Sequence, residues 1–212
     1  MQDLIARLRG RLQHGLAVQE TLDRLARHGL ALYPYLVYCE STDPPAAHRE
    51  GPESLHARLL TERDVPQLVA MRQRPDWEAT IHRRLARGDV GIGAFADDSI
   101  VAYTWCEIAH LRGFGRDCIL RALADDEATL ADSYTVPAWR GRGVLLVMRG
   151  EVYGTMRAMG KTRLYSVCMY FNRSIRRLKA KVGAHAVELR LSINLYERFK
   201  RDVLLKRYTD DA

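Results

Sequence analysis

The chain has 212 residues, of which 47% are hydrophobic and 28% are charged, which is typical of a soluble globular protein and excludes wholesale disorder and collagen-like chains. Lysine plus arginine exceeds aspartate plus glutamate by 33 − 26 = 7. This excess is compatible with a polyanionic partner such as nucleic acid, anionic lipid or a phosphate-rich cofactor, but on charge alone a solvated basic surface is the favoured explanation. No apolar run reaches the roughly 18 residues that a membrane span needs.

The cysteines and the first residues of the chain predict the compartment. Four cysteines are widely scattered, without a CxxC pair, which argues against a disulfide framework and a zinc site. The opening MQDLIARLRGRLQ has no unbroken apolar stretch of the kind that a secretory signal contains. We therefore expect a cytoplasmic protein without a metal site.

The N-terminal quarter is predicted as an extension. Residues 2–29 read as helical because leucine, isoleucine and valine recur at three- and four-residue steps. Arginines lie toward its other face, so this helix can pack on its own domain or lie on a membrane surface. A strand at 32–40 and a polar, proline-bearing linker at 41–53 follow. We place a boundary there, with a helical extension at 1–53 and a second domain at 54–212.

The second domain is predicted to mix helices and strands. The first half has a strand at 56–60, a helix capped by Thr61 and Asp64, a helix at 76–87, a hairpin at 89–108 and a loop at 110–126. The second half has a strand at 127–136, a helix at 142–159, a strand at 162–169, a helix from Asn172 to Val182, and two closing strands.

The segment Ser133–Met148, SYTVPAWRGRGVLLVM, carries the clearest chemical signal. A strand ends at a proline, a turn with two arginines and two glycines follows, and a helix begins at once. The start of a helix directs unpaired backbone N–H groups and its dipole at one point. Glycine lets a ligand approach the backbone closely, and the arginines add positive charge. The pattern predicts a pyrophosphate cradle, with an ordinary strand–turn–helix as the alternative.

In this order of elements the chain resembles the GNAT superfamily of acyl-CoA N-acyltransferases. The family's phosphate loop reads Gln/Arg-x-x-Gly-x-Gly/Ala, and Arg140–Leu145, RGRGVL, is similar to it. Asn172–Gly183 resembles the family's fourth helix and Leu60–Leu68 its opening helix, so that the resemblance covers about Ser54–Ala186. It implies a mixed α/β fold with a central twisted, mostly antiparallel sheet and flanking helices, preceded here by the helical extension.

The resemblance also implies an activity and a set of site residues. An acyl group, with acetyl as the first candidate, would pass from acetyl-CoA or another acyl-CoA to a primary amine by direct attack. The pantetheine arm would pair with the backbone of one strand end and the pyrophosphate with the helix start. The implied cofactor-binding residues are Thr135, Val136, Arg140, Gly141, Arg142, Gly143, Val144, Leu145, Leu146 and Asn172.

A base must first take a proton from the ammonium of the acceptor. Asp132 is the first candidate because it lies shortly before the cradle on the same strand, and Glu107 at the end of the hairpin is the second. His110 is third, since a lone loop histidine is more often a surface residue. Cys168 is interpreted as a small buried hydrophobe rather than a nucleophile.

Two departures from the family pattern affect the expected chemistry. Leu145 stands at the last small position of the loop, where a bulky side chain could crowd the cofactor. Lys179 stands at the position of the family's general-acid tyrosine, and a helix lysine is usually solvated. Two rival hypotheses follow: a catalytically inactive acyl-CoA-binding module of the same fold, and a basic nucleic-acid-binding protein, which lacks a recognisable nucleic-acid motif. The acceptor amine is open, and a homodimer is considered as well.

Overall fold

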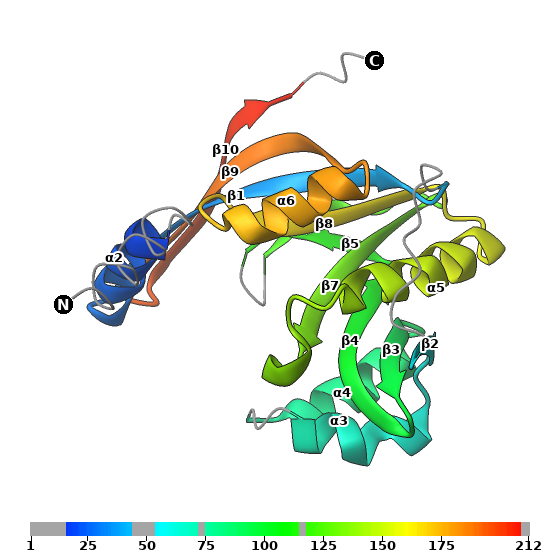
Figure 1. Cartoon of the computed structure of the whole chain (residues 1–212). Helices are drawn as coiled ribbons and strands as arrows, with labels where there is room; N and C mark the ends of the chain where they lie inside the picture. The colour runs from blue at the N-terminus through cyan, green and yellow to red at the C-terminus, as the bar shows by residue number, and fades with distance from the viewer. Residues whose placement is uncertain (1–15, 44–53, 72–74, 115–117, 209–212) are drawn as a thin grey trace, which may run out of the picture. The chain divides into compact units, whose positions relative to one another are not determined.

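The computed structural model describes residues 16–43, 54–71, 75–114 and 118–208 (Figure 1). They form two compact units. The first unit contains the described residues up to Glu40, those of 112–121 and those from Tyr165 onward. The second contains the described residues of 41–111 and all of 122–164. The first half of the predicted N-terminal helix, up to residue 15, and most of the predicted linker, 44–53, therefore lie outside the described residues.

The second unit has an antiparallel sheet with helices on both faces. Its strands are β2 (Leu55–Leu59), β3 (Val90–Ala96), β4 (Ser99–Glu107) and β7 (Glu127–Thr135), in the order β7-β4-β3-β2. Helix α5 (Val144–Ala158) covers one face, and α3 (Val65–Met71) and α4 (Trp77–Ala86) cover the other (Figure 1). A short 3-10 helix, η2 (Pro137–Trp139), follows β7.

Side-chain periodicity explains how these layers pack. Val144, Met148, Val152 and Met156 recur at four-residue steps along α5, and all four are buried against the sheet. Met159 follows the last residue of α5, Ala158, and is exposed. The opposite face is filled by aromatic and aliphatic side chains of α3, α4 and β4, among them Trp77, Ile81, Tyr103 and Trp105.

The first unit is also built around antiparallel pairs. Its elements are α2 (Leu16–Arg27), β1 (Leu30–Ser41), the part of β8 (Arg163–Met169) from Tyr165 on, α6 (Arg173–Lys181), β9 (His185–Leu195) and β10 (Phe199–Arg207). The strand order is β10-β9-β1-β8, so β1, from the predicted extension, lies between two strands of the C-terminal part. It pairs with β9 from Leu30↔Leu195 to Cys39↔His185. The predicted mixed α/β class with mostly antiparallel strands is confirmed.

Local signals were also mostly correct. In the 3-10 helix η1 (Glu62–Asp64), the Asp64 carboxylate accepts the Thr61 N–H at 2.8 Å, which confirms the predicted cap. The predicted loop at 110–126 was wrong in part, because β5 (His110–Arg112) and β6 (Ile119–Ala122) pair with each other. Strands of three and four residues are too short to show a periodic pattern. None of the described helices is long and apolar enough to cross a membrane.

Lys179 is buried, contrary to the expectation of a solvated helix lysine. Its side chain on α6 lies in the first unit, where Nζ is 3.9 Å from Oε2 of Glu40 on β1. The two residues are 4% and 1% exposed. Charges are found at such depth only when paired, so the carboxylate of β1 explains why α6 can carry a lysine on its inner face.

We predict that Lys179→Met lowers the free energy of unfolding by about 3–5 kcal/mol, because it leaves the Glu40 carboxylate buried without the opposing ammonium. Replacing both residues, as Lys179→Met with Glu40→Leu, should restore much of the loss. Urea unfolding measures both effects, with the exposed Lys181→Met as the control, expected within about 0.5 kcal/mol of wild type. Equal destabilisation by Lys179→Met and Lys181→Met would contradict the burial argument.

Candidate functional site

The turn between β7 and α5 has the backbone that the sequence pattern predicted. Gly141 and Gly143 adopt φ values of +78° and +79°, a left-handed conformation that favours glycine. A Cβ added to either residue would meet no heavy atom within 4 Å. Glycine is therefore favoured at both positions of this left-handed turn, and the space beside both residues is free of protein atoms.

The start of α5 lies directly after this turn. The Leu146 N–H donates to the Gly143 carbonyl at 2.8 Å, so this amide is already engaged. The amides of Val144 and Leu145 precede it in the first turn, where a helix supplies no acceptor of its own. The Leu145 side chain is partly buried and packs against the core beneath α5. The bulky side chain is thus held by the core, which removes the reason to expect it to crowd a ligand.

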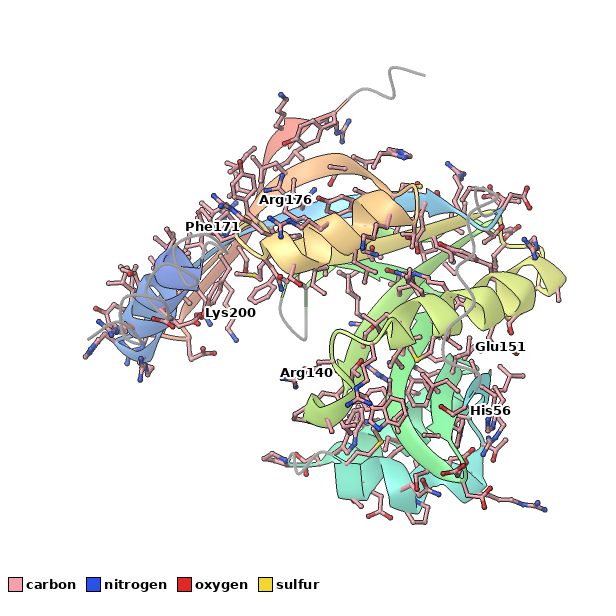
Figure 2. All side chains as sticks on the ribbon, in the orientation of Figure 1. His56, Arg140, Glu151, Phe171, Arg176 and Lys200 are labelled. Carbon is pink, nitrogen blue, oxygen red and sulfur yellow. The ribbon has the colours of Figure 1, made fainter. Side chains whose placement is uncertain are left out.

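Two exposed arginines flank the glycines. Arg140 lies in the segment between β7 and α5 (Figure 2). Its Nε donates to the Thr135 carbonyl at 3.1 Å, and its guanidinium lies 5.9 Å from the Tyr134 ring. The Arg142 guanidinium lies 5.3 Å from the Trp139 ring. Both positive charges are therefore held close to the turn, that of Arg140 by the end of β7 and that of Arg142 by η2.

The backbone groups of Val136 and Thr135, at the end of β7, face opposite edges of the strand. The Val136 N–H donates to the Val101 carbonyl at 2.9 Å, and the Val136 carbonyl accepts the Trp139 N–H at 3.0 Å. Both backbone groups of Val136 are therefore used inside the protein. Because backbone groups alternate along a strand, those of Thr135 point to the opposite edge of β7 from β4. Of the two residues predicted to pair with pantetheine, Thr135 is the one whose N–H lies on that edge, while its carbonyl accepts Nε of Arg140.

Asn172 lies in the first unit and caps α6. Its Oδ1 accepts the Ile175 N–H at 3.2 Å, as the sequence predicted. The cap accounts for one of its polar atoms, and its place among the cofactor-binding residues stays a prediction.

A bulge interrupts β7 at Asp132. Tyr103 pairs with Tyr134, but Trp105 pairs with Ala131, so that two residues of β7 lie opposite Thr104 alone. Asp132 itself has a φ of +45°, which is unusual for a residue other than glycine. The regular alternation of side chains along β7 therefore does not hold at this point.

A single arginine of α4 contacts both predicted candidate bases. Nη1 of Arg84 is 3.3 Å from Oδ2 of Asp132, and Nη2 is 3.9 Å from Oε1 of Glu107. The Arg84 guanidinium also lies 5.2 Å from the Trp105 ring and 6.0 Å from the Trp77 ring. Burial lowers the pKa of Arg84, and the two carboxylates oppose this effect. The structure thus brings together at one cation two side chains that the sequence analysis treated as alternatives.

The sequence analysis missed Arg84, although a signal was present. Trp77, Ile81 and Arg84 occupy positions i, i+4 and i+7 of one helix and so share its inner face. An arginine on an otherwise apolar stripe requires buried anionic partners.

The remaining candidates are His110 and Cys168. His110 begins β5 and is half-buried. Cys168 is buried beside Leu36 and Tyr38 in the first unit, and burial raises its pKa to about 11. It is therefore a protonated thiol at neutral pH, as expected for a buried hydrophobe. Within the described ranges, no group of three or more His, Cys, Asp or Glu side chains is arranged to hold a metal ion.

Comparison with known proteins identifies structural neighbours. No protein-family model matches the chain, and no curated protein matches it. A putative GNAT-family acetyltransferase from Novosphingobium aromaticivorans matches 85% of this chain and 69% of its own, with 22% identity and a TM-score of 0.54. A GNAT-family acetyltransferase from Colwellia psychrerythraea matches 82% and 60%, with 14% identity and a TM-score of 0.54. A protein of unknown function from Staphylococcus epidermidis matches 82% and 66%, with 8% identity and a TM-score of 0.57.

The coverage and identity values define what is similar between this chain and its structural neighbours. The chain spans between 60% and 69% of the length of the three neighbours. Sequence identities of 8–22% mean that the likeness concerns the fold.

Asp89, next to the Arg84 cluster, gives a pH prediction. Burial raises the pKa of its carboxyl, Arg87 partly offsets the rise through a hydrogen bond, and the charge of Glu107 adds to it. A carboxyl whose pKa is raised by folding contributes stability below its unfolded-state pKa, and this contribution is lost as the pH rises.

We therefore predict that Asp89→Asn, which has no charge to bury, gains stability over wild type as the pH rises from 3 to 7. A gain of about 1 kcal/mol corresponds to a melting temperature higher by about 2–4 °C. Calorimetric melting across this pH range measures it, with the exposed Asp98→Asn as the control. A difference between Asp89→Asn and wild type that does not vary with pH would refute the prediction.

Proposed function

We propose that this chain, which has the fold of the GNAT superfamily, transfers an acyl group from acyl-coenzyme A to a primary amine. The observation that supports the proposal best is the β7–α5 turn, in which two left-handed glycines leave open space at the start of a 15-residue helix. Pyrophosphate is the chemical group that such a combination of amides, dipole and arginines suits.

The residues around the turn would hold the co-substrate in a defined way. The amides of residues 142–145 would contact the pyrophosphate, with Arg140 and Arg142 as flanking charges. The Leu146 amide, already bonded to Gly143, would contribute less than the sequence analysis assumed. The Thr135 backbone would pair with the pantetheine arm, while Val136 keeps the end of β7 attached to β4.

The proposed reaction moves two protons and one acyl group. The acceptor ammonium gives a proton to a carboxylate, and the amine lone pair then forms a bond to the thioester carbonyl carbon. The carbon–sulfur bond breaks and its electron pair leaves on sulfur. The nitrogen loses its second proton, which passes through solvent to the thiolate, so that the products are an amide and coenzyme A thiol, and the first proton leaves the carboxylate to solvent. Asp132 and Glu107 are the proposed bases.

The leaving step is proposed to proceed without the family's tyrosine. Lys179 stands at that position, and its ammonium is paired with Glu40. A thiolate is a tolerable leaving group without a protein acid, so this departure is compatible with activity. An acyl-CoA-binding module without catalysis is the rival, and release of free coenzyme A thiol in the presence of an amine library separates the two. Acetyl is the proposed acyl group, and the acceptor is proposed only as a primary amine.

We predict that acetyl-CoA or a longer acyl-CoA raises the melting temperature, because a ligand that binds only the folded state stabilises it. At a concentration of about 100 times Kd the gain is about 2.7 kcal/mol. Thermal melting with acyl chains of increasing length measures it, and adenosine alone serves as the control. The absence of a shift at saturating concentration for every chain length would count against the whole proposal.

We further predict that Gly143→Asp abolishes coenzyme A binding, because it adds a side chain and a negative charge where the pyrophosphate would lie. Asp tolerates left-handed φ better than most residues, so the variant should fold. Gly143→Asn adds the same bulk without the charge and should weaken binding less. Arg142→Ala should cost on the order of 1 kcal/mol, as for one exposed charge-assisted contact.

Gly160 provides a matched control for these variants. It lies just beyond the other end of α5, has a φ of +74°, and also has open space around an added Cβ. Gly160→Asp should therefore repeat the backbone strain without touching the cradle. Calorimetric titration with coenzyme A compares all four variants. Undiminished binding by folded Gly143→Asp would mean that the loop is only a turn.

A further inference from the structure

We propose that Asp132 and Glu107 accept the acceptor's proton as one coupled carboxylate pair, with Arg84 as the positioning residue that holds them together. This inference rests on the acyl transfer proposed above. It replaces a choice between two separate bases with a single unit drawn from β4, β7 and α4.

The first support is the convergence of the three side chains. Glu107 ends β4, Asp132 lies in the bulge of β7, and Arg84 comes from the last turn of α4. Both carboxylates lie within 4 Å of nitrogens of the same guanidinium. These are ion-pair distances, so the shared positive charge, and not a hydrogen-bonded fork, is what brings the two carboxylates to the same place.

The second support is the enclosure of the guanidinium. The side chains of Arg84, Asp132 and Glu107 are 12%, 15% and 7% exposed, and two indole rings lie within 6.0 Å of the guanidinium carbon. Screening by water is weak at such burial, so the Arg84 charge acts on both carboxylates at once. Removing either carboxylate therefore changes the surroundings of the guanidinium that also contacts the other.

The third support is the backbone at Asp132. Its φ of +45° and the register shift opposite Thr104 place this residue in a strained position that straight pairing would avoid. Residues held in such conformations cluster at functional sites, where the surrounding structure fixes them. This backbone conformation has a consequence for the cluster, because it directs the Asp132 carboxylate to the same guanidinium that Glu107 contacts.

A double-mutant cycle tests the coupling. We expect Asp132→Asn and Glu107→Gln each to lower kcat about 100-fold, as for the loss of a general base, with little change in KM for acyl-CoA. The double variant should lose about as much kcat as the less active of the two single variants, because the effects of residues that act as one unit are non-additive. A product of the two losses, about 10,000-fold, or wild-type turnover by either single variant, would overturn the proposal.

Variants of Arg84 test its positioning role. Arg84→Met should lower kcat by about the same factor as a carboxylate variant while KM for acyl-CoA stays near wild type, and Arg84→Lys, which keeps the charge, should recover part of kcat. The control is Arg83→Met, an exposed arginine of the same helix, which should keep wild-type kcat. All assays are run below the melting temperature of every variant, so that unfolding does not lower the measured kcat. If the role of Arg84 is purely structural, Arg84→Met should keep wild-type kcat, and this result would overturn the assignment.

The outcomes separate this inference from the proposed function. A wild-type protein that transfers no acyl group to any amine would remove the proposed function, and the pair with it. An active wild-type protein with multiplicative losses would remove the pair alone and leave the acyl transfer standing.

Discussion

The ladder between β4 and β7 is the constraint on which the candidate site depends. At one end, the Val136 N–H donates to the Val101 carbonyl and fixes the place where the chain leaves the sheet for the glycine turn. Further along the same pair of strands, the register shift at Thr104 turns Asp132 toward α4. One strand therefore supplies both the start of the cradle and one carboxylate, and the number of residues between them fixes their separation. A shift of β7 along β4 would therefore displace both the glycine turn and the Asp132 carboxylate.

Features governed by neighbouring residues could be predicted from the sequence. The hairpin at 89–108 and the buried stripe of α5 follow from periods of two and about 3.6 residues. The turn before α5 follows from Pro137 and the glycines, because proline ends a strand and only glycine readily adopts the left-handed backbone found at 141 and 143. The Thr61 and Asn172 caps depend on residues three positions away, and both formed as expected.

Features that depend on distant partners could not be predicted. Arg84 contacts Asp132, 48 positions later in the numbering, and Lys179 contacts a carboxylate on β1 near the other end of the chain. Helix periodicity shows that each cation lies on an inner face, but it carries no information about which strand brings an anion there. The bulge at Asp132 is similar, since a register shift depends on the partner strand as much as on β7. Strands β5 and β6 were too short for any periodic signal.

Leu145 shows how packing decides what a departure from a motif means. A motif that ends in Gly or Ala can require a small side chain or only an accessible amide, and sequence alone does not distinguish the two. Here the leucine side chain packs against the core beneath α5, next to the stripe that begins at Val144. Its backbone amide remains in the first turn, one residue before the amide that Gly143 engages. The helix start therefore keeps its free donors while the side chain stabilises the same helix. At this position the backbone amide is the group proposed to bind the ligand, and the side chain contributes to core packing. Leucine is therefore compatible with both roles.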